Sequence, residues 1–442
     1  MTGAESGIAR HERVLFVALL LLHLAPIWLA GPLVTQDGPS HLSNAWILLR
    51  LASGDCPIVS DYFVANWRLS PNWLAHFALA GLGLVLPPVA AEKVIQSVCV
   101  AALPLAGRTA IAAIDRGAVL FAIALFPLSL GFPLVMGLYG FCLGVALAVW
   151  LYGFWARGRE RPRPARLAVL AAGGAVAFFV HPLPLALAVG VVGISEAGLA
   201  LLLLVLAAPD ASPRVGVITD RAVVALLALL VLLGSTAGLP RSAGVYAALL
   251  VASALGLLAA KVWKQAELDA ERREYLSVGP RLRVGSTLLP IHLRVSGPLG
   301  DRSRSPRIDP LVHASGYLAA ERCLVSLSNY EATYPAVFPT RFRPALDPYR
   351  AAQFDEYAPE WTDFVGYERR TGRAIDQLLV WGDDAAIERL DPTRRAPLRA
   401  LIARIEADYE LVFTTPGRGQ GRLYRRREGA AAPEPPPAAA GP

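Results

Sequence analysis

The chain has 442 residues, of which 55% are hydrophobic and only 17% are charged. Soluble domains carry about 25% charged residues, so the composition excludes an ordinary soluble protein. The formal net charge of +7 does not indicate nucleic-acid binding, because the basic residues form short clusters between apolar runs, without interleaved aromatic residues. The sequence predicts a mainly α-helical, multi-pass protein of the cytoplasmic (inner) membrane.

Nine apolar segments have about the length of a membrane-spanning helix. They are 14–35, 71–88, 90–107, 117–133, 135–155, 166–185, 187–207, 221–239 and 243–263. The 90–107 segment opens with Glu92 and Lys93, so it is the one expected to lie flat or re-enter the membrane. The first segment follows a basic N-terminus but is longer than a signal-peptide core, so we expect a retained helix.

Basic residues orient these spans through the positive-inside rule. Arg10 and Arg13 place the N-terminus in the cytoplasm, and loop 157–166 is the most arginine-rich of the chain. If 90–107 does not cross, all basic clusters lie inside, which gives eight spans and a cytoplasmic C-terminal domain. Nine spans would place that domain outside, but they would also place the arginine-rich loop outside, against the rule. The charge rule favours eight spans, and both topologies place loop 36–70 outside.

Residues 1–263 therefore form the predicted transmembrane bundle, and residues 275–427 predict a small soluble α/β domain. Strand-like runs occur at 283–293, 323–332, 374–382 and 409–416, and a Gly-rich turn completes a hairpin by residue 427. Residues 392–409 have the spacing of an amphipathic helix. Residues 428–442 are rich in Pro and Ala, and we expect them to be disordered.

Four cysteines occur, at positions 56, 99, 142 and 323. No C-x-x-C spacing is present, so neither a cysteine zinc site nor a redox pair is supported. A Cys56–Cys323 disulfide requires both thiols on one oxidising side of the membrane. The eight-span topology separates them, so the bridge is not favoured.

The stretch VTQDGPSHLSNAW, residues 34–46, lies at the end of the first span and contains an acid. Asp37 follows the span directly, and Gly38 and Pro39 break the helix. Apolar residues between positions 40 and 51 then share one face. They predict a short amphipathic helix on the membrane surface, with Trp46 at headgroup depth.

Two interpretations of Asp37 are open. Its carboxylate could cap the new helix by accepting the N–H of Ser40. Alternatively, it is a general base or cation ligand, with His41 four residues further on the same helix. The two roles do not exclude each other.

A cytoplasmic N-terminus, one outward helix and an Asp-bearing outer loop with a surface helix resemble the GT-C type glycosyltransferases. These polytopic enzymes transfer a sugar from a polyprenyl-phosphate donor to an acceptor outside the cytoplasmic membrane. The resemblance covers TQDGPSHLSNAW, the helix-rich middle and the trailing α/β domain. It implies that Asp37 is the catalytic base and that membrane lipid and a lipid-linked sugar are the partners. It implies no cofactor, although a divalent cation could bind. The family often has a second acid beside the first, and this sequence has Gly38 at that position.

Further polar residues on the outer side are candidates for substrate binding: His41, Asp61, Arg68, Asn72 and His181. Arg68 and His181 could steady the departing phosphate. Asn72, like His76 beside it, could instead cap or anchor the second span. His181 lies near the end of a span, where ionisable residues are functional candidates, but an interfacial histidine is the alternative.

The C-terminal domain carries a second polar group, made of His313, Tyr317, Tyr330, Glu331 and Tyr334. Tyrosines with an acid could bind a saccharide by stacking and hydrogen bonds. Packing in the core or at a sheet edge is the commoner explanation.

A competing hypothesis is a non-catalytic subunit or a transporter of an envelope-polysaccharide assembly system. A transporter should have two related halves with broken helices, and no such halves are found. A cavity enclosing Asp37, His41 and His181 would favour an enzyme, whereas a dry bundle with Asp37 as a cap would favour a subunit. The sequence does not define the oligomeric state.

Overall fold

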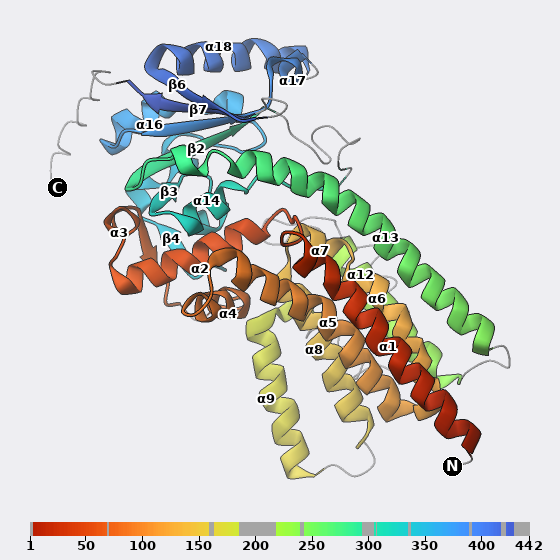
Figure 1. Cartoon of the computed structure of the whole chain (residues 1–442). Helices are drawn as coiled ribbons and strands as arrows, with labels where there is room; N and C mark the ends of the chain where they lie inside the picture. Colours follow the sequence, from red (N-terminus) through yellow and green to blue (C-terminus); the bar gives the residue numbers. More distant parts are fainter. Residues whose placement is uncertain are drawn as a thin grey trace. The chain divides into compact units, whose positions relative to one another are not determined.

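The computed structural model is mainly helical, with a small region of β-sheet (Figure 1). It describes residues 3–68, 70–158, 163–184, 218–238, 243–293, 305, 307–334, 337–388, 391–416 and 421–427. The chain forms two compact units. The first unit comprises Met1–Leu33, Ser70–Ala75 and Glu92–Glu267, and the second comprises Val34–Leu69, His76–Ala91 and Leu268–Pro442.

Helices build the first unit. They are α1 (Gly3–Leu29), most of α5 (Pro88–Ile114), the 3-10 helix η1 (Arg116–Ala124), α6 (Leu125–Ser129), α7 (Phe132–Met136), α8 (Tyr139–Ala156), α9 (Pro164–Val180), α12 (Ile218–Thr236) and the start of α13 (Ala243–Leu276). Within the described ranges, five segments are long and apolar enough to cross a membrane: His11–Leu29, Pro88–Ile114, Arg116–Met136, Tyr139–Ala156 and Ala243–Arg281.

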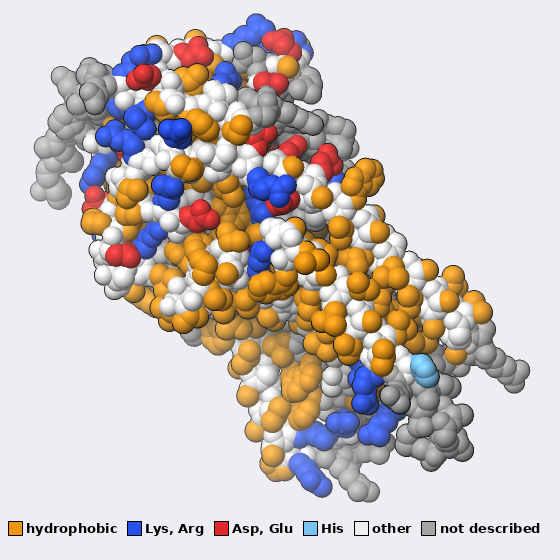
Figure 2. Space-filling model, viewed as in Figure 1, with side chains coloured by type: hydrophobic (Ala, Val, Ile, Leu, Met, Phe, Trp, Pro, Cys, Tyr) orange, Lys and Arg blue, Asp and Glu red, His pale blue; other side chains and the backbone are white. Residues whose placement is uncertain are grey.

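Large apolar side chains cover the outer faces of these helices. Figure 2 shows hydrophobic atoms side by side along them, and the exposed residues include Val14, Leu21, Trp28, Leu230 and Leu249. An apolar face of this extent would aggregate in water and is suited to lipid. Composition, helix length and surface are thus those of a membrane protein.

The structure revises two of the predicted spans. Segment 71–88 contains only the ten-residue helix α4 (Leu74–Gly83), which is about 15 Å long and cannot cross a hydrocarbon core of about 30 Å. Segment 90–107, expected to lie flat or re-enter, belongs instead to the continuous 27-residue helix α5. Segment 187–207 lies outside the described residues.

The polar residues that made 90–107 look unsuitable are satisfied inside the first unit. The Tyr139 hydroxyl donates to Oε1 of Glu92 at 2.8 Å, and the Gln96 amide donates to that hydroxyl at 3.0 Å. Because these side chains hydrogen-bond to one another, their burial carries a smaller penalty than that of isolated polar residues. A sequence does not reveal such partners.

The second unit contains a five-stranded sheet in the order β3-β2-β5-β7-β6. The strands are β2 (Ser286–His292), β3 (Leu324–Ser326), β5 (Gln377–Trp381), β6 (Tyr409–Thr414) and β7 (Gly421–Arg426), all within segments that the sequence pattern predicts as strands. β2 is parallel to β3 and β5, whereas β7 is antiparallel to β5 and β6.

Both faces of this sheet are covered. Leu289 and Leu378 pack on one face with the helices α16 (Phe364–Thr371) and α18 (Pro392–Asp408). The alternate residues Leu288 and Leu379 pack on the other face with the end of α13 and with α14 (Ser315–Glu321). Burial on both faces is complete for β2, β3 and β5, whose residues are all buried. Residues 428–442 lie outside the described residues.

The segment 34–69, which contains all of the predicted outer loop 36–70 except Ser70, belongs to the second unit. It folds into α2 (Gly38–Ser53), α3 (Pro57–Tyr62) and β1 (Phe63–Ala65), and β1 pairs antiparallel with β4 (Thr340–Phe342). The predicted surface helix is therefore wrong in its location: Leu42, Ala45 and Trp46 of α2 are buried in protein. An amphipathic pattern gives an apolar face but does not say whether lipid or protein covers it.

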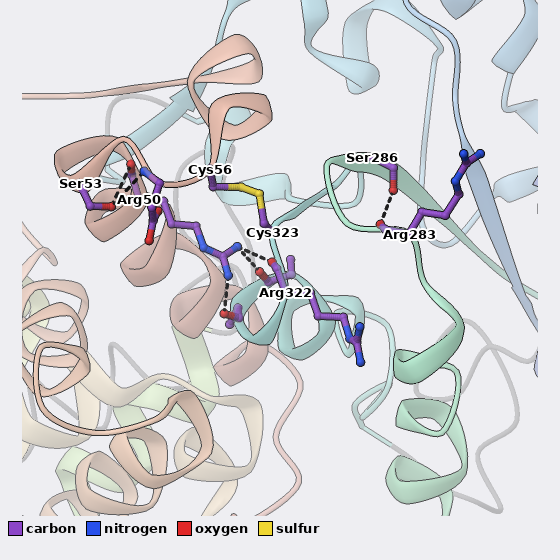
Figure 3. The surroundings of a disulfide bond; sticks show 10 residues. Arg50, Ser53, Cys56, Arg283, Ser286, Arg322 and Cys323 are labelled. Carbon is purple, nitrogen blue, oxygen red and sulfur yellow. Dashed lines mark hydrogen bonds between the residues drawn. A yellow bond between two sulfur atoms is a disulfide. The ribbon is translucent and has the colours of Figure 1, made fainter.

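A disulfide joins this loop to the C-terminal part of the chain. Cys56 and Cys323 are bonded, and the Arg50 guanidinium donates to the carbonyl oxygens of Ala319, Ala320 and Arg322 beside them (Figure 3). The bridge that the charge rule disfavoured is present. Residues bonded within one unit lie on one side of a membrane, whereas the eight-span topology places these two cysteines on opposite sides.

Candidate functional site

The second unit encloses five ionisable side chains that lie close together: Asp37, His41, His76, His313 and Glu331. Each is at most 7% exposed. Taking charged groups out of water costs several kcal/mol per group unless partners compensate. A buried concentration of this kind therefore requires either complete pairing or a function.

Three distant segments supply the cluster. His41 lies at the start of α2, which begins at Gly38, and His76 lies in the first turn of α4. Glu331 is held by the 3-10 helix η4 (Tyr330–Thr333), where the Asn329 side chain accepts the N–H of Ala332 as a cap. The histidines are 35 residues apart, and Glu331 follows His76 by 255 residues.

His41, His76 and Glu331, called the His-His-Glu triad below, face one another. Nδ1 of His41 lies 2.5 Å from Oε1 of Glu331, and Nε2 of His76 lies 2.9 Å from Oε2. The two imidazole nitrogens are 3.2 Å apart. Among the described residues, this is the group whose nitrogen and oxygen atoms could hold a metal ion.

Asn44, one turn after His41 on α2, fixes the Glu331 carboxylate. Its amide nitrogen donates to Oε2 of Glu331 at 2.8 Å and to Oδ1 of Asn329 at 3.0 Å. Its amide oxygen accepts hydrogen bonds from Asn329, at 3.1 Å, and from Thr340. The carboxylate orientation is thus set by a layer of side chains behind the triad.

The electrostatics of the triad favour an ionised carboxylate. Burial raises the pKa of Glu331, but the neighbouring His41 and His76 outweigh this effect and lower the pKa to about 2. Glu331 therefore carries a negative charge at neutral pH. That charge is available to a cation held between the three side chains.

Asp37 occupies the N-cap position of α2 but does not act as a side-chain cap. Its carboxylate accepts no capping hydrogen bond from the helix, which makes capping alone the wrong interpretation. Burial raises its pKa to about 6, against the lowering influence of His41 and of hydrogen bonds from Gln36 and Tyr330. A carboxylate with this pKa accepts protons near neutral pH far better than an exposed aspartate does.

The His313 imidazole lies beside the Asp37 carboxylate, with Nε2 3.6 Å from Oδ1. Its ring lies against Tyr330, with centroids 4.7 Å apart. Burial lowers the pKa of His313 to about 3, so this ring is neutral at physiological pH. Its Nδ1 is buried and has no hydrogen-bond partner among the described residues.

The other predicted site residues do not join this cluster. Asp61 is half exposed and forms an ion pair with Arg373 at 3.4 Å, and Arg68 is exposed. Asn72 and His181 belong to the first unit. There Asn72 lies against Gly140 of α8, and Nε2 of His181 lies 3.3 Å from an Arg221 nitrogen.

Sequence reasoning named Asp37 and His41 as a pair but treated His76, His313 and Glu331 as separate candidates. It missed Asn44, Asn329 and Thr340. Asn44 is buried with the rest of Gly38–Leu48, but it lies off the apolar face of the sequence pattern, so no local signal marked it. No local spacing could show that it meets Glu331.

No protein-family model matches this sequence, and neither a curated protein nor a solved structure is found to be similar to it.

Proposed function

We propose that the chain is an integral membrane glycosyltransferase that moves a sugar from a polyprenyl-phosphate donor to an acceptor on the outer face of the membrane. The observation that carries the proposal is Asp37: a buried carboxylate, released from capping, whose pKa is raised to about 6. A carboxylate that serves only structure is normally paired and has a lowered pKa.

The proposed reaction uses Asp37 as general base. As the acceptor oxygen bonds to the anomeric carbon, its proton passes to the Asp37 carboxylate. The bond between that carbon and the lipid phosphate breaks, and the phosphate keeps the electron pair. The His-His-Glu triad lies in the same cluster, where its imidazoles, or a cation that they hold, can stabilise the negative charge that develops on the phosphate.

An outer location of the site is supported by the Cys56–Cys323 disulfide, because disulfides persist in oxidising compartments. Arg10 and Arg13 then leave the N-terminus in the cytoplasm, and α1 leads outward. Since the second unit contains both the residues after α1 and the residues after α13, both helices end on the outer side.

Contacts inside the first unit suggest the remaining crossings. His181 ends α9 and meets Arg221 near the start of α12, so these two helix ends lie on one side. We therefore propose seven crossings: α1, α5, η1 to α7, α8, α9, α12 and α13. Loop 157–166 then lies in the cytoplasm, as the positive-inside rule requires. Only the weaker clusters of basic residues lie on the outer side, against that rule. This count of crossings does not include residues 185–217.

A non-catalytic subunit of an envelope-polysaccharide system is the second candidate. It is favoured by the near-complete burial of Asp37 and Glu331, which leaves little of either carboxylate on the surface. An enzyme must open this cluster to its substrates, whereas a subunit has no such need.

The deciding experiment substitutes Asp37→Asn and follows transfer from a radiolabelled lipid-linked sugar pool in membrane vesicles. Asparagine keeps the size and an acceptor oxygen but removes the base. We expect normal protein content and loss of transfer by at least about a hundredfold. The matched control is Asp55→Asn, because Asp55 is an exposed acid in the same outer segment. Unchanged transfer in the Asp37 variant would leave the subunit as the better explanation.

A further inference from the structure

The His-His-Glu triad contains a conflict that hydrogen bonds alone do not resolve. Each contact to an ionised Glu331 oxygen requires a proton on the facing imidazole nitrogen, at 2.5 Å from His41 and 2.9 Å from His76. The 3.2 Å contact between the same two nitrogens requires a lone pair on one of them. With Glu331 ionised and only these groups present, no placement of protons satisfies all three contacts.

A cation between the three side chains removes the conflict. Deprotonated His41 and His76 would each direct a lone pair at the ion, as would the Glu331 carboxylate. Roughly 2.0–2.1 Å separates zinc from nitrogen or carboxylate ligands, which places tetrahedral ligand atoms about 3.3 Å from one another. Nδ1 of His41 and Nε2 of His76 are already 3.2 Å apart, and one Glu331 oxygen lies within 4.8 Å of both nitrogens.

The residues around the triad hold its side chains in place, as expected of a preformed binding site. Metal-ligating carboxylates in proteins are themselves held by hydrogen bonds from neighbouring groups. Asn44 plays that part for Glu331, and Asn329 and Thr340 hold Asn44 in turn. Three ligands from three segments, oriented before any ion arrives, reduce the entropy lost on binding.

We propose that His41, His76 and Glu331 bind a divalent transition-metal ion of the zinc class, with a fourth position open to an oxygen ligand. Two imidazoles and one carboxylate suit zinc, whereas magnesium and calcium prefer ligand sets made of oxygen. The proposal goes beyond sugar transfer, because a subunit could hold the same ion. Metal content and transfer activity are measured separately, so either can fail alone.

The test uses the full chain, purified in detergent with its disulfide intact. The protein is treated with a chelator, desalted, incubated with zinc and desalted again, and bound metal is measured by mass spectrometry. We expect one equivalent of zinc per chain, magnesium not to be retained, and loss of retention in both His76→Ala and Glu331→Gln. The exposed His11→Ala is the matched control and should keep its zinc.

A second readout does not depend on how the variants fold. Cobalt added to the wild-type protein should give the intense visible absorption of a four-coordinate ion, and zinc should abolish it. Absence of stoichiometric zinc in the wild type, or a six-coordinate cobalt spectrum, would overturn the proposal. So would equal zinc retention in correctly folded triad variants, with folding judged by elution volume and disulfide content.

Discussion

The side-chain amide of Asn44 donates to Oε2 of Glu331 at 2.8 Å, across 287 residues of sequence. This hydrogen bond joins the helix that follows the first membrane span to the C-terminal part of the chain. It makes the outer loop and the C-terminal part a single structural entity, so substitutions in either should affect both.

Asn44→Ala should destabilise the second unit by about 1–3 kcal/mol, because buried polar partners lose their hydrogen bonds. Glu331, Asn329 and Thr340 would all be affected. Thermal unfolding of the purified protein measures the effect. Ser53→Ala, an exposed position on the same helix, is the control and should change stability by less than about 0.5 kcal/mol. Equal unfolding temperatures for the two variants would contradict the role given to Asn44.

The disulfide predicts which side of the membrane the C-terminal part occupies. In a background without Cys99 and Cys142, the Cys56→Ser variant frees the Cys323 thiol. A membrane-impermeant maleimide added to intact spheroplasts should then label Cys323, provided that the second unit is outside. The chain with both Cys56 and Cys323 should react only after reduction. Labelling of Cys323 that requires membrane lysis would reverse the proposed topology.

Glu356 should make stability depend on pH. Burial raises the pKa of this carboxyl from 4.5 to about 7, while hydrogen bonds from Tyr349 and Ser328 lower it and Asp355 raises it. A raised pKa in the folded state means that folding favours the protonated acid. This contribution to stability is fully present below pH 4.5 and is lost as the pH rises towards 7.

Glu356→Gln keeps the shape of the side chain and cannot ionise, so the variant should gain stability relative to the wild type between pH 4.5 and about 7. Unfolding temperatures of both proteins, measured through this range, give the difference. Other titrating groups contribute equally to both proteins and cancel. A difference that does not change with pH would show that the Glu356 pKa is not raised.

Gly316→Ala should loosen the packing of α14 on α2. A Cβ at this position would lie 2.3 Å from the carbonyl oxygen of Pro39, a backbone atom that cannot rotate away. We expect a loss of about 1–3 kcal/mol, as for other overpacked positions. Gly279→Ala in the same unit is the control, because its nearest neighbour atom would be 3.5 Å away. The two unfolding temperatures decide whether α2 and α14 are in contact.

Apolar runs and periodicity in the sequence were sufficient for the elements whose partners are close in the chain. The membrane character, the strands around Leu289, Leu378 and Leu423, and the helix from Pro392 follow from them, because burial imposes a local pattern on each element. The start of α2 after Asp37 was also visible locally, because Gly38 and Pro39 form its first turn, although α1 already ends at Leu29.

Only the tertiary structure decided what covers each apolar face and what each buried polar group meets. The face of α2 meets protein and not lipid, Glu92 and Gln96 share Tyr139 within the first unit, and Cys56 reaches Cys323. The His-His-Glu triad depends on the same kind of information. Two of its members, His76 and Glu331, are 255 residues apart, and contacts at such separations leave no periodic trace in the sequence.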